Sequence, residues 1–132
     1  MKALVYGNEK TIEKLAGLLA KEGIKVEGRE EAFSGKAGWT ESGRFDLVII
    51  DSKLENAEMA CRTIRKQGDT PIALLVHPKQ ANWKKLQSMD ADCYLSETRE
   101  DMELAARLKA VIRRFFNPVP MGNILQTNAG RL

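Results

Sequence analysis

The sequence predicts an α/β domain with a doubly wound parallel sheet of five strands and five helices. Apolar runs such as Leu47–Ile50 do not alternate with polar residues, which is typical of strands covered on both faces. These runs alternate with segments such as residues 12–19, whose apolar side chains recur at helical spacing. Short links between them favour right-handed crossovers, with the first strand central in the sheet beside the third.

The first half of the chain contains three predicted strands and two predicted helices. Residues 3–6 form the first strand, and residues 12–19 form a helix that Gly23 stops. A short second strand covers residues 24–26. Residues 28–43 contain a poor helix, because Gly35 and Gly38 interrupt it. The third strand ends the segment at residues 46–51.

The second half continues the alternation. A helix is predicted at residues 57–66, and Pro71 introduces a fourth strand at residues 72–76. A helix over residues 82–89 and a strand over residues 91–95 follow. One face of a long last helix is marked by Leu104, Leu108, Val111, Ile112 and Phe115.

The composition describes a single soluble globular domain. The chain has 132 residues, 43% hydrophobic and 30% charged, and its net charge of +3 does not specify a partner. No apolar stretch approaches the roughly 20 residues that a membrane helix requires, and the amino terminus enters a strand pattern directly. We therefore expect a cytoplasmic protein without membrane contact. Cys61 and Cys93 lack metal-type spacing, which favours reduced packing residues.

The predicted domain covers residues 1–116. Residues 117–132 contain Pro118, Pro120 and Gly122 and then an isolated apolar pair, a pattern that indicates a linker and one stray strand.

Asp51 is the first candidate functional residue. It ends the third strand, at the carboxyl edge where open parallel sheets place their functional side chains. The alternative is that the Asp51 carboxylate only caps the following turn.

Several of these segments resemble the receiver domain of two-component response regulators, a flavodoxin-like fold. The resemblance covers about residues 2–114 and includes Asp46-Leu-Val-Ile-Ile-Asp51, Pro71-Ile-Ala-Leu-Leu75 and Ala91-Asp-Cys-Tyr-Leu95. The last helix, residues 103–114, is similar to the fifth receiver helix of the OmpR/PhoB winged-helix class. In that class a linker and a DNA-binding domain follow, and residues 122–132 resemble that domain's opening strands.

The resemblance also implies a degenerate phosphorylation pocket. The family holds Mg²⁺ with an acidic pair and uses an acceptor Asp, a Thr or Ser, and a Lys, which together neutralise the charge on the transferred phosphoryl group. This sequence keeps the acceptor as Asp51 but has Gly7 and Asn8 at the acidic pair, Val76 at the hydroxyl and Glu97 at the lysine. We therefore expect no catalytic residues, no enzyme activity, and weak or absent Mg²⁺ binding.

Other chemistry at this edge is open. One alternative is a site for a hard metal ion made of three carboxylates, those of Glu9, Asp51 and Glu97. The other is that Glu9 only starts a helix and that Glu97 faces solvent. His77 is interpreted as a loop side chain rather than a base. Tyr94 matches the aromatic switch position of receivers.

The resemblance implies a homodimer through the fourth helix, fifth strand and fifth helix. Asp92, Glu103, Arg107 and Arg114 stand at the family's pairing charges, and Trp83, Leu86 and Met89 are predicted as an apolar seam. The predicted interface comprises Trp83, Leu86, Met89, Asp92, Glu103, Leu104, Arg107, Leu108 and Arg114. The alternative is that Glu103 and Arg107 form only an intrahelical pair and that Trp83 belongs to the core.

The leading hypothesis is an atypical receiver that dimerises without phosphorylation of Asp51 and regulates a winged-helix transcription factor. DNA contact then belongs to a domain not present in this chain, and little in the pocket supports an upstream histidine kinase. The alternatives are a conventional phospho-accepting switch using Asp51, and a ligand-sensing module using the cleft between Gly7 and His77.

Overall fold

The computed structural model describes residues 1–30, 44–66, 68–77, 79, 82–89, 91–98 and 100–116. They form a parallel sheet of five strands with the order β2-β1-β3-β4-β5. The strands are β1 (Lys2–Tyr6), β2 (Lys25–Arg29), β3 (Leu47–Asp51), β4 (Ile72–Val76) and β5 (Cys93–Ser96). The helices are α1 (Glu9–Ala20), α2 (Ala57–Lys66), α3 (Trp83–Ser88) and α4 (Asp101–Phe116).

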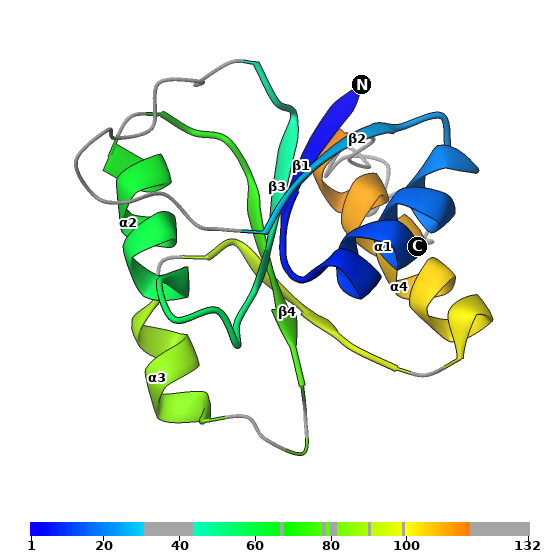
Figure 1. Ribbon diagram of the computed structural model, residues 1–132. Coiled ribbons are helices and arrows are strands. Elements are labelled where there is room, and N and C mark those ends of the chain that lie inside the picture. The colour runs from blue at the N-terminus through cyan, green and yellow to red at the C-terminus, as the bar shows by residue number, and fades with distance from the viewer. Residues whose placement is uncertain are drawn as a thin grey trace, which may run out of the picture.

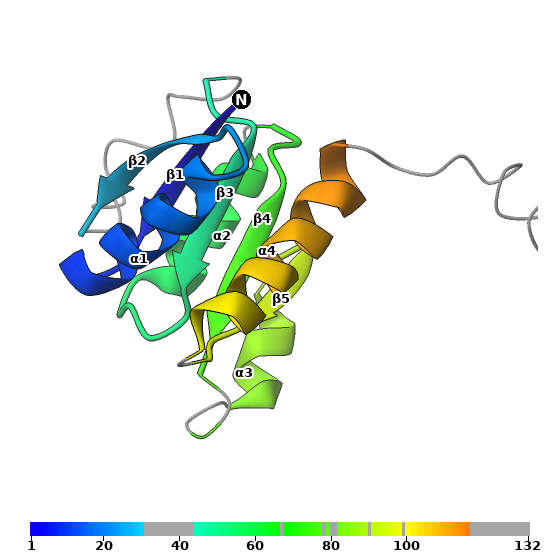
Figure 2. The ribbon, with the colours of Figure 1, turned by 90° about the vertical axis from the view of Figure 1, so that its right-hand side faces the viewer.

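The helices cover both faces of the sheet. Helices α1 and α4 lie on one side, and α2 and α3 lie on the other (Figures 1 and 2). Every residue of β3 and β4 is buried, because helices shield both faces of these strands. This arrangement explains why the apolar run in β3 does not alternate with polar residues.

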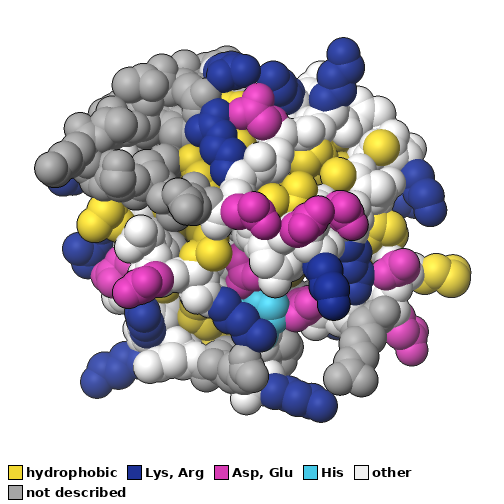
Figure 3. Space-filling model, in the orientation of Figure 1, with side chains coloured by type: hydrophobic (Ala, Val, Ile, Leu, Met, Phe, Trp, Pro, Cys, Tyr) yellow, Lys and Arg dark blue, Asp and Glu magenta, His cyan; other side chains and the backbone are white. Residues whose placement is uncertain are grey.

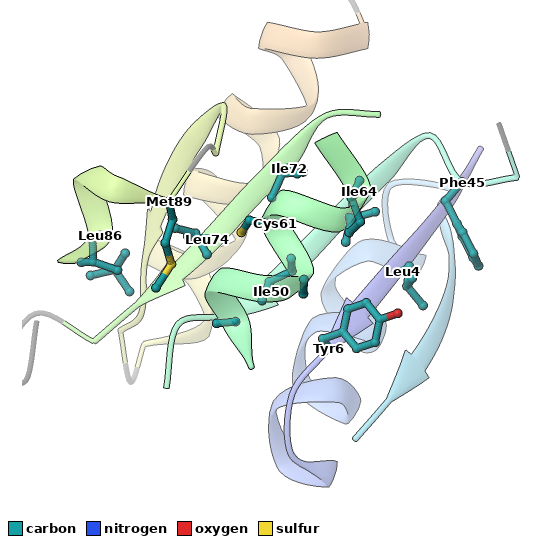
Figure 4. Close-up of a cluster of buried hydrophobic side chains, with 14 residues drawn as sticks. Leu4, Tyr6, Phe45, Ile50, Cys61, Ile64, Ile72, Leu74, Leu86 and Met89 are labelled. Atoms are coloured by element: carbon teal, nitrogen blue, oxygen red, sulfur yellow. The ribbon is translucent and has the colours of Figure 1, made fainter. Parts of the chain in front are cut away.

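The two faces of the sheet carry separate hydrophobic clusters. One cluster packs α2 and α3 on the sheet and includes Ile64, Leu74, Leu86 and Met89 (Figure 4). The other packs α1 and α4 on the opposite face. Helices therefore pack against both faces of the sheet, and this packing fixes the strand ends that carry the side chains of the carboxyl edge.

The predicted fold class is confirmed, with β1 beside β3 as expected. Strands and helices match the predicted segments within a few residues, and α2 and β4 match them at both ends. The described residues contain four helices rather than five. β2 extends to Arg29, so residues 28 and 29 of the stretch predicted to hold the interrupted helix are strand. Residues 31–43 of that stretch and all of the predicted linker, residues 117–132, lie outside the described residues. None of the helices in the described part of the chain has the length and apolar content needed to span a membrane.

Candidate functional site

The carboxyl edge of the sheet brings together Asp51, His77 and Glu97. Asp51 ends β3, His77 follows β4 directly, and Glu97 follows β5 directly. Because parallel strands end at the same edge, these three residues are neighbours although they are distant in the sequence. Asp51 is one of two buried polar residues in the described part of the chain, with 4% of its surface exposed.

The ring of His77 lies between the two carboxylates. Its Nε2 atom is 2.8 Å from Oδ1 of Asp51, and its Nδ1 atom contacts the carboxylate of Glu97. The imidazole side chain is 12% exposed and the Glu97 side chain is 40% exposed. Each ring nitrogen therefore faces one carboxylate, and the ring bridges the side chains of Asp51 and Glu97.

The backbone of the turn after β3 completes the contacts of Asp51. The Lys53 amide donates a hydrogen bond of 2.9 Å to Oδ1 of Asp51. The predicted turn-capping role of this carboxylate is therefore present, together with the contact to His77. His77 lies in the loop after β4, as predicted, and its ring contacts both Asp51 and Glu97, so Glu97 does not simply face solvent. The available signal was the position of His77 immediately after the fourth apolar run.

The family's acidic-pair positions have structural roles here. Asn8 is the N-cap of α1, and its side-chain oxygen accepts a hydrogen bond of 2.8 Å from the Thr11 amide. Gly7 is buried, and a Cβ atom there would lie 3.2 Å from Cγ2 of Thr11. Val76 is fully buried in β4. These side chains supply neither a carboxylate nor a hydroxyl to the site.

The alternative metal site is not formed. Glu9 lies exposed in the first turn of α1. Across the described ranges, no group of three or more His, Cys, Asp or Glu side chains is arranged to hold a metal ion. Glu9, Asp51 and Glu97 therefore do not make the three-carboxylate site that their sequence positions allow.

A hollow adjoins the carboxylate pair on the side of α3. Its volume is about 310 Å³, and it is lined by Ser52, Lys53, His77, Asn82, Lys85, Leu86 and Met89. His77 is the residue that both lines the hollow and contacts Asp51 and Glu97. Figure 3 shows this histidine, in cyan, at the surface between basic and acidic side chains.

Four predicted interface residues belong to the core of the monomer. Leu86 and Met89 are each 4% exposed, and Figure 4 shows them in the cluster with Leu74. Leu104 and Leu108 are each 1% exposed in the cluster on the opposite face of the sheet. Assigning these four residues to a dimer interface was wrong, because their helical spacing directs them onto the sheet.

Two aromatic side chains are exposed: Trp83 of the predicted dimer interface and Tyr94 at the predicted aromatic switch position. Trp83 is 49% exposed and Tyr94 is 42% exposed, so Trp83 is not a core residue. Their rings meet edge to face with centroids 6.1 Å apart. The Tyr94 hydroxyl donates a hydrogen bond of 3.3 Å to the Leu86 carbonyl, which fixes the ring beside α3.

The predicted pairing charges make contacts within the chain. Asp92 accepts hydrogen bonds from Arg65 and from the Ile72 amide, at 2.6 and 2.7 Å. Arg107 binds the Glu103 carboxylate at 2.7 Å, the intrahelical pair considered as the alternative, and also donates to the Ser96 carbonyl at 2.8 Å. The exposed pair of Glu103 and Arg107 contributes little to stability, and the role of these charged residues in pairing stays a prediction.

A second hollow of about 370 Å³ lies between β5 and α4 on this face. It is lined by Cys93, Tyr94, Leu95, Ser96, Arg107, Ala110, Val111 and Arg114. Burial raises the pKa of the Cys93 thiol, while the Arg114 charge acts in the opposite direction and Asp92 adds to the rise.

Comparison with known proteins gives sequence relatives, among them a protein named as a response regulator. No model of a known protein family matches the chain. The chain is 36% identical over 94 residues to Protein RcaC of Microchaete diplosiphon, an alignment covering 66% of this chain and 14% of that protein. It is 35% identical over 88 residues to the response regulator ArlR of Staphylococcus haemolyticus, covering 62% of this chain and 40% of that protein. The chain thus spans less than half the length of either relative.

The fold has close counterparts among solved structures. The receiver domain of the TMAO respiratory system response regulator TorR superposes with a TM-score of 0.67 at 23% identity, covering 86% of this chain and 98% of that one. This similarity establishes that the described residues have the receiver fold.

Proposed function

Because the chain folds as a receiver domain and is related in sequence to response regulators, we propose that it is a regulatory receiver whose output does not require phosphorylation of Asp51. The observation that carries the proposal is the contact of His77 with both Asp51 and Glu97. The Asp51 oxygen Oδ1 already accepts from His77 and from the Lys53 amide. In this proposal the domain is an interaction module and not an enzyme.

The donor set at the edge does not fit Mg²⁺. This ion prefers an octahedral set of oxygen ligands with carboxylates among them. Gly7 has no side chain to offer, and the Asn8 side-chain oxygen is used in capping α1. We therefore propose that Mg²⁺ binds weakly or not at all, so that the family's route to a phosphorylated aspartate is closed.

Glu97 adds an electrostatic argument. At a separation of 4 Å, two like unit charges repel by about 4 kcal/mol when the effective dielectric constant is 20. A phosphoryl group on Asp51 would bring further negative charge next to the site where His77 already holds Glu97. At the positions where the resemblance implies a metal-binding acidic pair and a lysine, this chain has Gly7, Asn8 and Glu97. The charge compensation at those positions is therefore lost, which supports an output that does not depend on phosphorylation.

We further propose that two copies pair through the face formed by α3, β5 and α4. An isologous interface draws its energy from a buried aromatic and aliphatic centre. Trp83 and Tyr94 offer an exposed aromatic pair, and Ala110 lines the adjacent hollow between β5 and α4. Arg107 and Arg114 border the same hollow and would lie at the rim of this interface.

The relatives are longer than this chain, which makes the role of the whole protein a proposal. One relative is named as a response regulator. We propose that this receiver governs the pairing of a winged-helix domain, and that DNA contact is made by that domain. Control by a histidine kinase would not be required for pairing.

Sedimentation velocity on the 132-residue chain tests the proposal. We expect a concentration-dependent dimer that is unchanged by Mg²⁺ and beryllofluoride, because Asp51 lacks the partners that stabilise such an adduct. Ala110→Arg should weaken the dimer, because Ala110 is exposed and lines the hollow between β5 and α4. Met102→Arg on the same helix is the matched control, because Met102 is 88% exposed and does not line this hollow.

Two results would overturn the proposal. A monomer at every concentration would remove pairing as the output. A specific response of the amides around Asp51 to beryllofluoride with Mg²⁺, together with a change in assembly, would favour the conventional phospho-accepting switch.

A further inference from the structure

We infer that the hollow beside His77 binds a small ligand that joins an oxyanion to a short apolar group. The oxyanion is a phosphate monoester or a carboxylate, and Lys53 and Lys85 are its charged contacts. This site is separate from the proposed dimer face and binds without any covalent change at Asp51. The inference does not depend on the proposed function.

Several hydrogen-bond donors in the lining of the hollow have no partner among the residues that the structure describes. Within the described ranges, neither Lys53 nor Lys85 makes a side-chain ion pair or hydrogen bond, although each carries three ammonium donors. The Ser52 hydroxyl likewise has no partner there. The Asn82 side-chain oxygen accepts from the Lys85 amide at 3.2 Å, which leaves its amide nitrogen as a donor. A ligand that accepts hydrogen bonds therefore fits these four side chains.

The lysines that line the hollow, Lys53 and Lys85, are the charged residues among its described lining. None of the seven lining residues is acidic. The two nearby carboxylates, Asp51 and Glu97, do not line the hollow, and both are bound to His77, which does. The ammonium groups of Lys53 and Lys85 are the charged groups of this lining, and they would attract an anion. Charge-assisted hydrogen bonds of this kind are stronger than neutral ones.

The floor and the size of the hollow limit the ligand. Leu86 and Met89 are buried core residues that also line the hollow, so its base is apolar. Its volume of about 310 Å³ lies at the lower end of the usual range for ligand pockets, roughly 300–1,000 Å³. This space suits one anionic group with a ring or short chain and is too small for a dinucleotide.

The test uses phenyl phosphate and benzoate as two anionic probes, with phenol as the neutral control. We expect saturable amide shifts at Ser52, Lys53 and Lys85 on titration of the 132-residue chain, and a higher melting temperature, because the ligand binds only the folded state. The tighter of the two anions identifies the preferred oxyanion. An unchanged protein mass after the titration excludes phosphoryl transfer.

Paired lysine variants decide whether the charges act as proposed. The double substitution Lys53→Gln and Lys85→Gln should weaken binding at least about tenfold, because two charge-assisted contacts are lost. The matched control is Lys10→Gln with Lys21→Gln, which removes the same charge from exposed lysines of the α1 region. Three results would overturn the inference. The first is an equal loss of affinity in both double variants, and the second is an affinity for phenol equal to that for the anions. The third is the absence of a saturable shift at Ser52, Lys53 and Lys85 in millimolar phenyl phosphate. The dimer proposal would stand in each of these cases.

Discussion

His77 and Asp51 form the central contact of this domain, with 2.8 Å between Nε2 and Oδ1. Since the other ring nitrogen contacts Glu97, one side chain connects the ends of β3, β4 and β5. A single side chain therefore joins two carboxylates at the carboxyl edge of the sheet.

His77→Ala should lower the free energy of unfolding by about 1–3 kcal/mol, the usual cost when a charged group loses its partner. Asp51 is buried and loses its side-chain partner, and Glu97 loses its contact with the ring. Urea unfolding followed by circular dichroism measures the change. Lys79→Ala is a suitable control, because Lys79 lies exposed two residues further on. Equal stability of the two variants would show that the contact contributes nothing.

Leu104→Arg should unfold the domain rather than only separate a dimer. Leu104 is 1% exposed against the sheet, so a guanidinium there is buried without a partner. The milder Leu104→Ala should cost about 2–5 kcal/mol, the range for large-to-small core substitutions. Met102→Arg on the same helix should change the free energy of unfolding by less than about 0.5 kcal/mol, because Met102 is 88% exposed. If the Leu104→Arg variant were instead folded and monomeric, this result would support the assignment of Leu104 to the dimer interface.

The contrast between Leu104 and Ala110 shows where sequence reasoning succeeded and where it failed. Apolar periodicity predicted the helix and its buried face, because burial imposes that spacing. The same apolar residues were assigned to a dimer interface by resemblance, but periodicity alone cannot separate a core face from an interface. The contact of His77 with Asp51 joins residues 26 positions apart, and no local pattern encodes it. Only the alignment of strand ends in the sheet makes these residues neighbours.

Two glycines of the first half should respond oppositely to alanine. In Gly28→Ala, the new Cβ atom would lie 2.2 Å from Cγ2 of Ile12, a branched side chain packed on the core. We expect a loss of about 1–3 kcal/mol in the free energy of unfolding from this overpacking. Gly17→Ala meets no atom within 4 Å inside α1 and should gain about 0.5–1 kcal/mol through helix propensity. Thermal or urea unfolding of the two variants compares them, and losses of equal size would refute the steric argument.

Asp92→Ala should affect the monomer and not only its pairing. The Asp92 carboxylate holds both Arg65 and the Ile72 amide, so its removal leaves a strand amide and a guanidinium without this acceptor. We expect a loss of about 1–2 kcal/mol that does not depend on protein concentration. Asp69→Ala provides the comparison, because Asp69 is exposed. A change in dimer affinity with unaltered monomer stability would instead support a purely interfacial role.

Alkylation of Cys93 reports the electrostatics of the hollow between β5 and α4. The thiolate is the reactive form, and burial raises the pKa of this thiol, so iodoacetamide should react more slowly at neutral pH than with an exposed cysteine. The rate should rise with pH as the thiolate forms. Cys61 is fully buried and should not react in the folded protein.

Arg114→Gln removes the charge that lowers the pKa of Cys93 and should slow the reaction several-fold at neutral pH, whereas Arg113→Gln should not. Mass spectrometry measures these rates at a concentration where the chain is monomeric. If the two arginine variants reacted at equal rates, Arg114 would have no effect on the thiol.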